Sequence, residues 1–189
     1  MKAWLGKIPF QKLLIEVFSI VLAVLLALGV NQWREQEANE ALARTALANV
    51  ASELESNLKL LTLINTNNAA ALESISDQED DEPVVFVPGL QLQEIAWESL
   101  LSTGVSTYVD YSTILMISET YSIQDVYKGL GAQVTQAEMT ATAFSVAMGT
   151  VVDDRILRSE FVGYFELLVQ IELQLLESYG LAMEALKMR

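Results

Sequence analysis

The sequence predicts an all-α protein, with one N-terminal transmembrane helix followed by an extramembrane antiparallel helical bundle. Four observations lead to this prediction. Residues 17–30 form an apolar stretch without a charge, and apolar residues recur at helical spacing over most of the remaining chain. The three prolines, at positions 9, 83 and 88, lie outside the strongly periodic segments, so long helices are permitted. A chain of 189 residues is long enough for one span and one domain of ordinary size.

Residues 1–12 are predicted to be a cytoplasmic or interfacial tail, and residues 13–33 the transmembrane helix. The tail interleaves Trp4 and other large apolar residues with three lysines, a composition that suits the membrane interface; an unstructured tail is the alternative. A helix needs roughly 20 mostly apolar residues to cross a bilayer, so this span is marginally short. Its ends are expected to be held at the two interfaces by the following residues: Trp4, Lys12, Asn31, Trp33 and Arg34.

The apolar stretch has two other interpretations. A cleaved signal peptide has a basic start, an apolar core and a small-x-small cleavage site, which Ala27-Leu28-Gly29 would supply. A type IV pilin also places a glutamate in an N-terminal apolar helix. Its processing site requires a glycine followed by a hydrophobic residue where this chain has Gln11 and Lys12, which argues against a pilin.

Charge predicts the orientation and excludes some partners. The chain carries a net charge of −14, and residues 34–189 carry eight basic and twenty-four acidic side chains. So acidic a domain would repel a phosphate backbone, which argues against nucleic acid as a partner. Three lysines precede the span and fewer basic residues follow it closely, which favours a cytoplasmic N-terminus and a periplasmic or extracytoplasmic C-terminal domain in a bacterial inner membrane.

Residues 34–189 are predicted to form the acidic helical bundle, beginning with a long helix to about residue 75. That helix could continue directly from the span. A stripe at alternating steps of three and four runs along it: Leu47, Val50, Leu54, Asn57, Leu61, Ile64, Asn68, Ala71 and Ile75. We expect this stripe to be the inner face of a bundle within one chain. A dimeric coiled coil, with the asparagines fixing its register, is the alternative.

An acidic loop is predicted at about residues 76–90, with a short extended run between Pro83 and Pro88. It lacks the glycine and the closing glutamate that an EF-hand calcium loop requires, so a solvated loop is expected.

The rest of the bundle is predicted to comprise four further helices, so that two long antiparallel helices, at the start and the end of the bundle, have shorter helices between them. The first covers residues 91–103 and ends at Gly104; the second is capped by Asp110 and runs to about residue 128. Gly129 and Gly131 allow a bend there, and a separate helix is predicted over 132–148. Asp153 and Asp154 are expected to cap the last helix. Its apolar stripe consists of Leu157, Phe161, Tyr164, Leu168, Ile171, Leu175, Tyr179 and Ala182, and its surface acids are Glu160, Glu166, Glu172 and Glu177.

Glu16 is the main candidate for a functional residue, because ionisable groups within a bilayer are costly and often functional. A local pair with Lys12, four residues earlier, would be a structural explanation. The alternative hypothesis is contact with another membrane subunit through Glu16, Ser19, Ala23 and Ala27.

The remaining residues do not indicate an enzyme, and no cofactor or metal site is expected. The chain has no cysteine and no histidine, which removes thiolate nucleophiles, the usual zinc sites and imidazole acid–base chemistry. Trp97 is expected to lie in the core. The tyrosines at 108, 111, 121 and 127 could line a small pocket, but tyrosine commonly lies at the edge of a bundle core with its hydroxyl toward water.

Two segments carry a family resemblance. One is the anchor, with Glu16 followed by Asn31-x-Trp33; the other comprises Trp97-x-x-Leu100, Ser102-x-Gly104 and Tyr121. Together they resemble an uncharacterised bacterial family of single-pass membrane proteins with a domain of unknown function. The resemblance implies the architecture and topology, and no activity.

The function expected from these features is that of a non-catalytic, membrane-anchored accessory or scaffold protein. Its partners would be membrane lipid and either other integral membrane proteins or further copies of itself. The alternative is an extracytoplasmic ligand-sensing helical bundle that signals through a partner.

Overall fold

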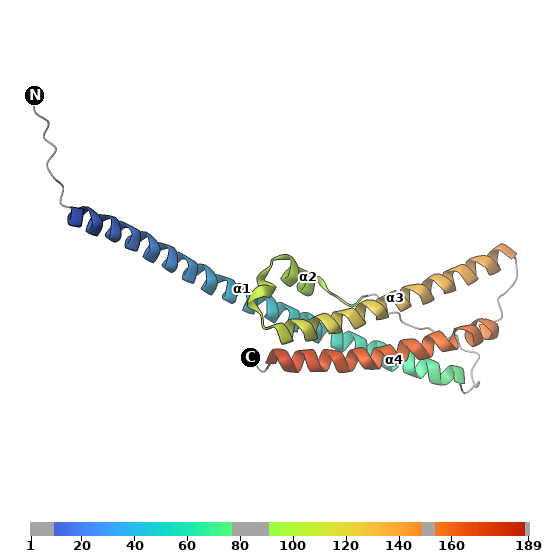
Figure 1. Cartoon of the computed structure of the whole chain (residues 1–189). Helices are drawn as coiled ribbons and strands as arrows, with labels where there is room; N and C mark the ends of the chain where they lie inside the picture. The colour runs from blue at the N-terminus through green and yellow to red at the C-terminus, as the bar shows by residue number, and fades with distance from the viewer. Residues whose placement is uncertain (1–9, 77–90, 149–153, 188–189) are drawn as a thin grey trace, which may run out of the picture. The chain divides into compact units, whose positions relative to one another are not determined.

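The fold is all-α, as predicted. A computed structural model describes residues 10–76, 91–148 and 154–187, and no strand occurs among them. The helices are α1 (Phe10–Ser76), α2 (Ile95–Ser102), the short 3-10 helix η1 (Val105–Tyr108), α3 (Tyr111–Met148) and α4 (Asp154–Lys187) (Figure 1). The chain divides into two compact units, Met1–Leu42 and Ala43–Arg189. Trp4, the acidic loop and Asp153 fall outside the described residues.

The first unit contains the N-terminal part of α1, which is one continuous helix through the predicted span and the segment after it. Fourteen large apolar side chains from Leu13 to Trp33 are each at least 45% exposed. α1 is the one described helix that is long and apolar enough to cross a membrane, and its apolar window is not buried within the protein. This makes the N-terminal part of α1 a candidate membrane span.

The second unit packs the C-terminal part of α1 against α3 and α4, with α2 and η1 beside them (Figure 1). Contacts between side chains fix the directions of the helices. Glu53 and Asn57 of α1 bond Tyr121 and Gln124 of α3, so these two helices run parallel. Gln124 and Tyr127 of α3 bond Tyr179 and Glu172 of α4 in the reverse order, so α4 runs antiparallel to both.

The stripe predicted on α1 is confirmed as the inner face of this bundle. Every member from Val50 to Asn68 is buried, and Leu47 and Ala71 are half-buried. The buried side chains of the other elements complete one core: Leu92, Trp97, Leu100, Ile117, Tyr121, Tyr127, Val134, Phe165, Leu168, Leu175, Tyr179 and Ala182.

The prediction of two separate helices, ending at about residue 128 and covering 132–148, is wrong. α3 is a single helix of 38 residues, so the bundle has three long helices rather than two with shorter helices between them. Glycine costs only about 1 kcal/mol relative to alanine inside a helix, and burial of flanking residues such as Tyr127 and Val134 offsets that cost.

The predictions for Gly104 and Asp110, at the ends of two helices, are confirmed. Gly104 has a φ of 72°, the left-handed conformation that glycine adopts easily, and it follows α2 as predicted. Asp110 caps α3, because its Oδ2 atom accepts hydrogen bonds from the backbone N–H groups of Ser112 and Thr113 at 3.1 and 3.4 Å.

Candidate functional site

The N-terminus of α2 is capped by a side chain from a different helix. Glu94, the residue before α2, makes no side-chain cap of its own. Instead the carboxylate of Glu53, on α1, accepts the backbone N–H of Ala96 at 2.8 Å and that of Trp97 at 3.4 Å. These are the second and third amides of α2, the groups that an N-cap normally satisfies. Glu53 therefore attaches α2 to α1.

Two aromatic residues complete the surroundings of Glu53. The hydroxyl of Tyr121, on α3, donates to Glu53 Oε1 at 2.6 Å. The rings of Tyr121 and Trp97 are stacked, with centroids 5.5 Å apart. Burial first, and then the Glu53 carboxylate, raise the pKa of Tyr121 well above its usual range, so the phenol stays protonated and continues to donate.

A second set of polar side chains surrounds Gln124, which is completely buried on α3. Its Oε1 atom accepts from Asn57 Nδ2 at 3.2 Å and from the hydroxyl of Tyr179, and its Nε2 atom donates to the carbonyl of Gln93 at 3.1 Å. Asn57 also pairs with the backbone of Gln93 in both directions, at 2.7 and 2.9 Å. This Gln124 network ties α1, α3, α4 and the segment before α2 together.

A third set centres on Glu172 of α4, which is also completely buried. Its carboxylate accepts Asn65 Nδ2 at 3.0 Å, Asn68 Nδ2 at 2.6 Å and the hydroxyl of Tyr127 at 2.7 Å. Neutral donors from two other helices therefore stabilise the negative charge without a cation among these three contacts. We call these four residues the Glu172 cluster.

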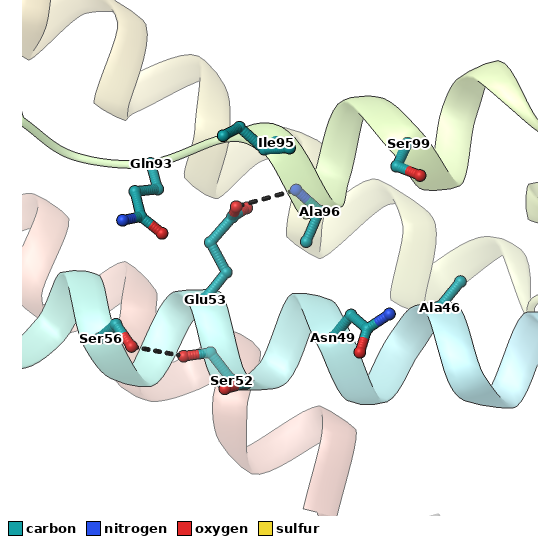
Figure 2. A pocket seen from close by; sticks show the side chains of 9 residues that line it. All are labelled: Ala46, Asn49, Ser52, Glu53, Ser56, Gln93, Ile95, Ala96 and Ser99. Carbon is teal, nitrogen blue, oxygen red and sulfur yellow. Dashed lines mark hydrogen bonds between the residues drawn. The ribbon is translucent and has the colours of Figure 1, made fainter.

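One hollow opens on the surface beside Glu53. It has a volume of about 460 Å³ and lies between α1 and the segment that contains α2 (Figure 2). Its lining consists of Ala46, Asn49, Ser52, Glu53 and Ser56 from α1, with Gln93, Ile95, Ala96 and Ser99 opposite. Figure 2 shows the Glu53 side chain reaching from α1 toward Ala96 at the wall of this hollow.

The residues that the sequence singled out lie elsewhere. Glu16, Ser19, Ala23 and Ala27 all lie on the N-terminal part of α1 and are exposed, as are Lys12, Asn31, Trp33 and Arg34. Ser19 Oγ donates to the backbone carbonyl of Glu16 at 2.8 Å. In the described ranges the ion pairs join Lys59 to Glu55 and Lys128 to Glu94, and Lys12 with Glu16 is not among them.

Two predictions for the bundle are wrong. Glu172 was expected on the surface of the last helix, but it is buried on the same face as Leu168 and Leu175; Tyr164, expected in the stripe, is half exposed. The hydroxyls of Tyr121 and Tyr127 were expected to face water, but both donate to buried carboxylates. Trp97 lies in the core, as predicted.

Sequence reasoning missed Glu53, Gln124 and Glu172 as a buried polar set. One signal could have revealed Glu172, because it lies three residues before Leu175 and four after Leu168 on the apolar stripe. Glu53 carried a similar signal, because it lies three residues after Val50 and four before Asn57 on the stripe of α1. It precedes the buried Leu54, and its partners come from residues more than forty positions away.

The three polar sets described above join helices to one another, and their hydrogen bonds are accounted for by that role. Among the residues that the structure describes, no group of three or more acidic side chains is placed to hold a metal ion. The chain matches no protein-family model, no curated protein and no solved structure.

The buried phenols of Tyr121 and Tyr179 lead to a prediction about alkaline pH. Burial raises the pKa of both, whereas in the unfolded chain a tyrosine ionises near pH ~10. The folded state therefore keeps protons that the unfolded state loses. The free energy of unfolding should be undiminished below about pH 10 and then fall by about 1.4 kcal/mol per pH unit for each tyrosine. Urea unfolding of the full chain in detergent micelles across this pH range measures the decline.

Replacing one of these phenols separates this effect from other alkaline effects. Tyr121→Phe should make the decline with pH shallower, whatever it does to stability at neutral pH. Tyr111→Phe, at a residue that is 77% exposed, is the matched control and should leave the slope unchanged. Equal slopes in Tyr121→Phe and the unmodified chain would contradict the assignment.

Proposed function

We propose that this protein is a non-catalytic, single-pass membrane-anchored accessory or scaffold protein that docks on other membrane proteins or on further copies of itself. The observation that carries the proposal is the exposure of the apolar side chains of α1 from Leu13 to Trp33. Exposed residues follow one another closely enough to lie on every side of the helix. A helix that is apolar all round requires an apolar environment, and a bilayer provides one.

Charge supports the orientation. Lys2, Lys7 and Lys12 precede the apolar stretch, whereas the segment after it belongs to a strongly acidic region. The positive-inside rule then favours a cytoplasmic N-terminus and an extracytoplasmic C-terminal unit, in a bacterial inner membrane. The resemblance of the anchor and of the segment around Trp97 to a bacterial family of single-pass proteins supports the same topology, and we propose membership of that family.

Membrane insertion is tested by alkaline carbonate extraction of vesicles that contain the full chain. We expect the chain to stay in the membrane fraction. Replacing Leu22 and Leu25 together by lysine should release it, because each buried charge costs about 2.5–3.5 kcal/mol at the centre of a span. Leu63→Lys, at an exposed leucine of the second unit, is the control and should remain bound. Release of the unmodified chain would refute insertion.

Orientation is tested by labelling single cysteines with a membrane-impermeant maleimide, which the absence of native cysteine makes straightforward. Glu177→Cys lies on an exposed part of α4 and should be labelled from the outside of intact cells whose outer membrane is permeabilised. Ala3→Cys should be labelled only after the inner membrane is opened. The opposite pattern would invert the topology.

Docking through the membrane is tested at Glu16. This carboxylate, Ser19, Ala23 and Ala27 recur at steps of three and four on α1, so they share one side of that helix. Purification in mild detergent should recover stoichiometric companions or a homo-oligomer with the unmodified chain, and less with Glu16→Gln. Leu25→Ala, on the opposite side, is the matched control. Recovery that is unchanged in Glu16→Gln would exclude this contact.

A further inference from the structure

The hollow beside Glu53 has the charge and size of a small-ligand site. Its volume of about 460 Å³ lies within the range of roughly 300–1,000 Å³ that ligand sites occupy. Glu53 is the one ionisable side chain in its lining, and it is only 7% exposed. A buried carboxylate at the wall of an open hollow favours a cationic ligand over an anionic one, as does the net charge of −14.

The hydrogen bonds of Glu53 leave room for one more donor. A carboxylate offers about four acceptor positions. Oε1 accepts from Tyr121 and Trp97, whereas Oε2 accepts from Ala96 at 2.8 Å. All three partners are donors, so the ionised form satisfies every one of them. An ammonium group entering the hollow would supply a fourth donor and neutralise the charge.

The rest of the lining suits a small polar molecule with a short alkyl part. Asn49 and Ser99, which are exposed and lie across from each other in Figure 2, offer an amide and a hydroxyl at the rim. Ile95, at the start of α2, is 72% exposed and offers an apolar side chain near Glu53, whereas Ala46 offers a methyl group on the α1 side (Figure 2). A divalent metal fits poorly, because a single carboxylate faces the hollow and metal sites need several oxygen ligands.

We propose that this hollow binds a small aliphatic primary amine, with the ammonium group on the Glu53 carboxylate and the alkyl part against Ile95. This binding activity goes beyond the docking role and does not depend on it, because every lining residue lies within the second unit. Since the same carboxylate caps α2, an amine bound there would also stabilise the attachment of α2 to α1.

The experiment uses the full chain in detergent micelles with ¹⁵N-labelled tryptophan. The chain has three tryptophans, and the Trp97 backbone amide donates directly to Glu53. Titration with ethanolamine at neutral pH should shift the Trp97 amide signal saturably, with a dissociation constant in the millimolar range for so small a ligand. The signals of Trp4 and Trp33 should not move. No saturable shift at Trp97 would overturn the proposal.

Control ligands test whether the ammonium group is what the hollow recognises, and whether that group belongs to a free amine or to a lipid headgroup. Propanol, which lacks the charge, and propionate, which reverses it, should not saturate the signal; saturation by either with equal affinity would overturn the proposal. The ammonium could belong to a free amine or to a lipid headgroup. Tighter binding of ethanolamine than of glycerophosphoethanolamine would identify a free amine, and the reverse would identify a headgroup; both results support the ammonium site.

Variants test the site itself. Glu53→Gln should weaken binding by about tenfold or more, because it removes the charge that accepts the ammonium. Ser99→Leu should weaken it similarly by filling the hollow, and it leaves Glu53 and its three donors untouched, so it remains informative if Glu53→Gln unfolds. Glu98→Gln removes an equal charge from α2 outside the lining and should bind normally. Unchanged binding in Ser99→Leu would place the ligand elsewhere.

Discussion

Glu172→Ala should lower the free energy of unfolding by about 3 kcal/mol or more. The substitution removes three hydrogen bonds to a charged acceptor, from Asn65, Asn68 and Tyr127, and each such bond contributes about 1.5–3 kcal/mol. It also leaves a cavity where the side chain was completely buried. Urea unfolding of the full chain in micelles, followed by the near-ultraviolet circular dichroism of the stacked Trp97 and Tyr121 rings, measures the loss.

Two further variants show whether the loss in Glu172→Ala comes from the buried carboxylate. Glu172→Gln keeps the shape of the side chain and one acceptor oxygen. Its NH2 group replaces the other oxygen and so faces a hydrogen-bond donor instead of accepting from it. We therefore expect a smaller loss of about 1–2 kcal/mol. Glu177→Ala, at an exposed glutamate of the same helix, should change stability by no more than about 0.5 kcal/mol. If Glu172→Ala were as mild as Glu177→Ala, the Glu172 cluster would not stabilise the bundle.

Gln124→Leu should lower the free energy of unfolding by about 2–4 kcal/mol. Leucine nearly fills the volume, so the loss comes from polar groups and not from a cavity. The hydroxyl of Tyr179 loses its acceptor, Asn57 loses one of its two, and the carbonyl of Gln93 loses one of its donors. The same urea experiment measures it.

The matched control for this variant is Gln133→Leu, which makes the same change at an exposed glutamine of α3 and should be nearly neutral. A double variant with Asn57→Ala provides the sharper test. Because Asn57 and Gln124 bond each other, their combined loss should be smaller than the sum of the single losses. Strict additivity would show that the two side chains do not act together.

The helices and the inner face of α1 could be predicted from the sequence because both depend on local spacing. The step of three and four from Leu47 to Asn68 placed apolar and amide side chains on one side of a helix, and that side is buried. Asp110 was likewise recognisable as a cap because its partners lie two and three residues further on. Patterns of this kind need no knowledge of the other helices.

The candidate site depended on contacts that no local pattern encodes. Glu53 caps a helix that begins more than forty residues later, and nothing in the sequence around Glu53 identifies that helix as its partner. The sequence predicts Glu172 on the surface because acidic side chains usually lie there. The side-chain amides that donate to its carboxylate belong to Asn65 and Asn68 of α1, more than one hundred positions earlier. At Gly129 the local pattern predicted the end of a helix, but packing of α3 overrides this helix-breaking tendency and the helix continues.

The spacing of the buried polar residues restricts how the long helices of the second unit can move. Apolar side chains alone would let one helix slide past another by a turn, about 5.4 Å, and pack again. Here such a slide would separate Glu172 from Asn65 and Asn68 and, in the same movement, Tyr179 from Gln124. Sliding of α4 along its axis would therefore break hydrogen bonds at both Glu172 and Gln124. Buried amides and carboxylates thus fix the register of the three long helices of the bundle.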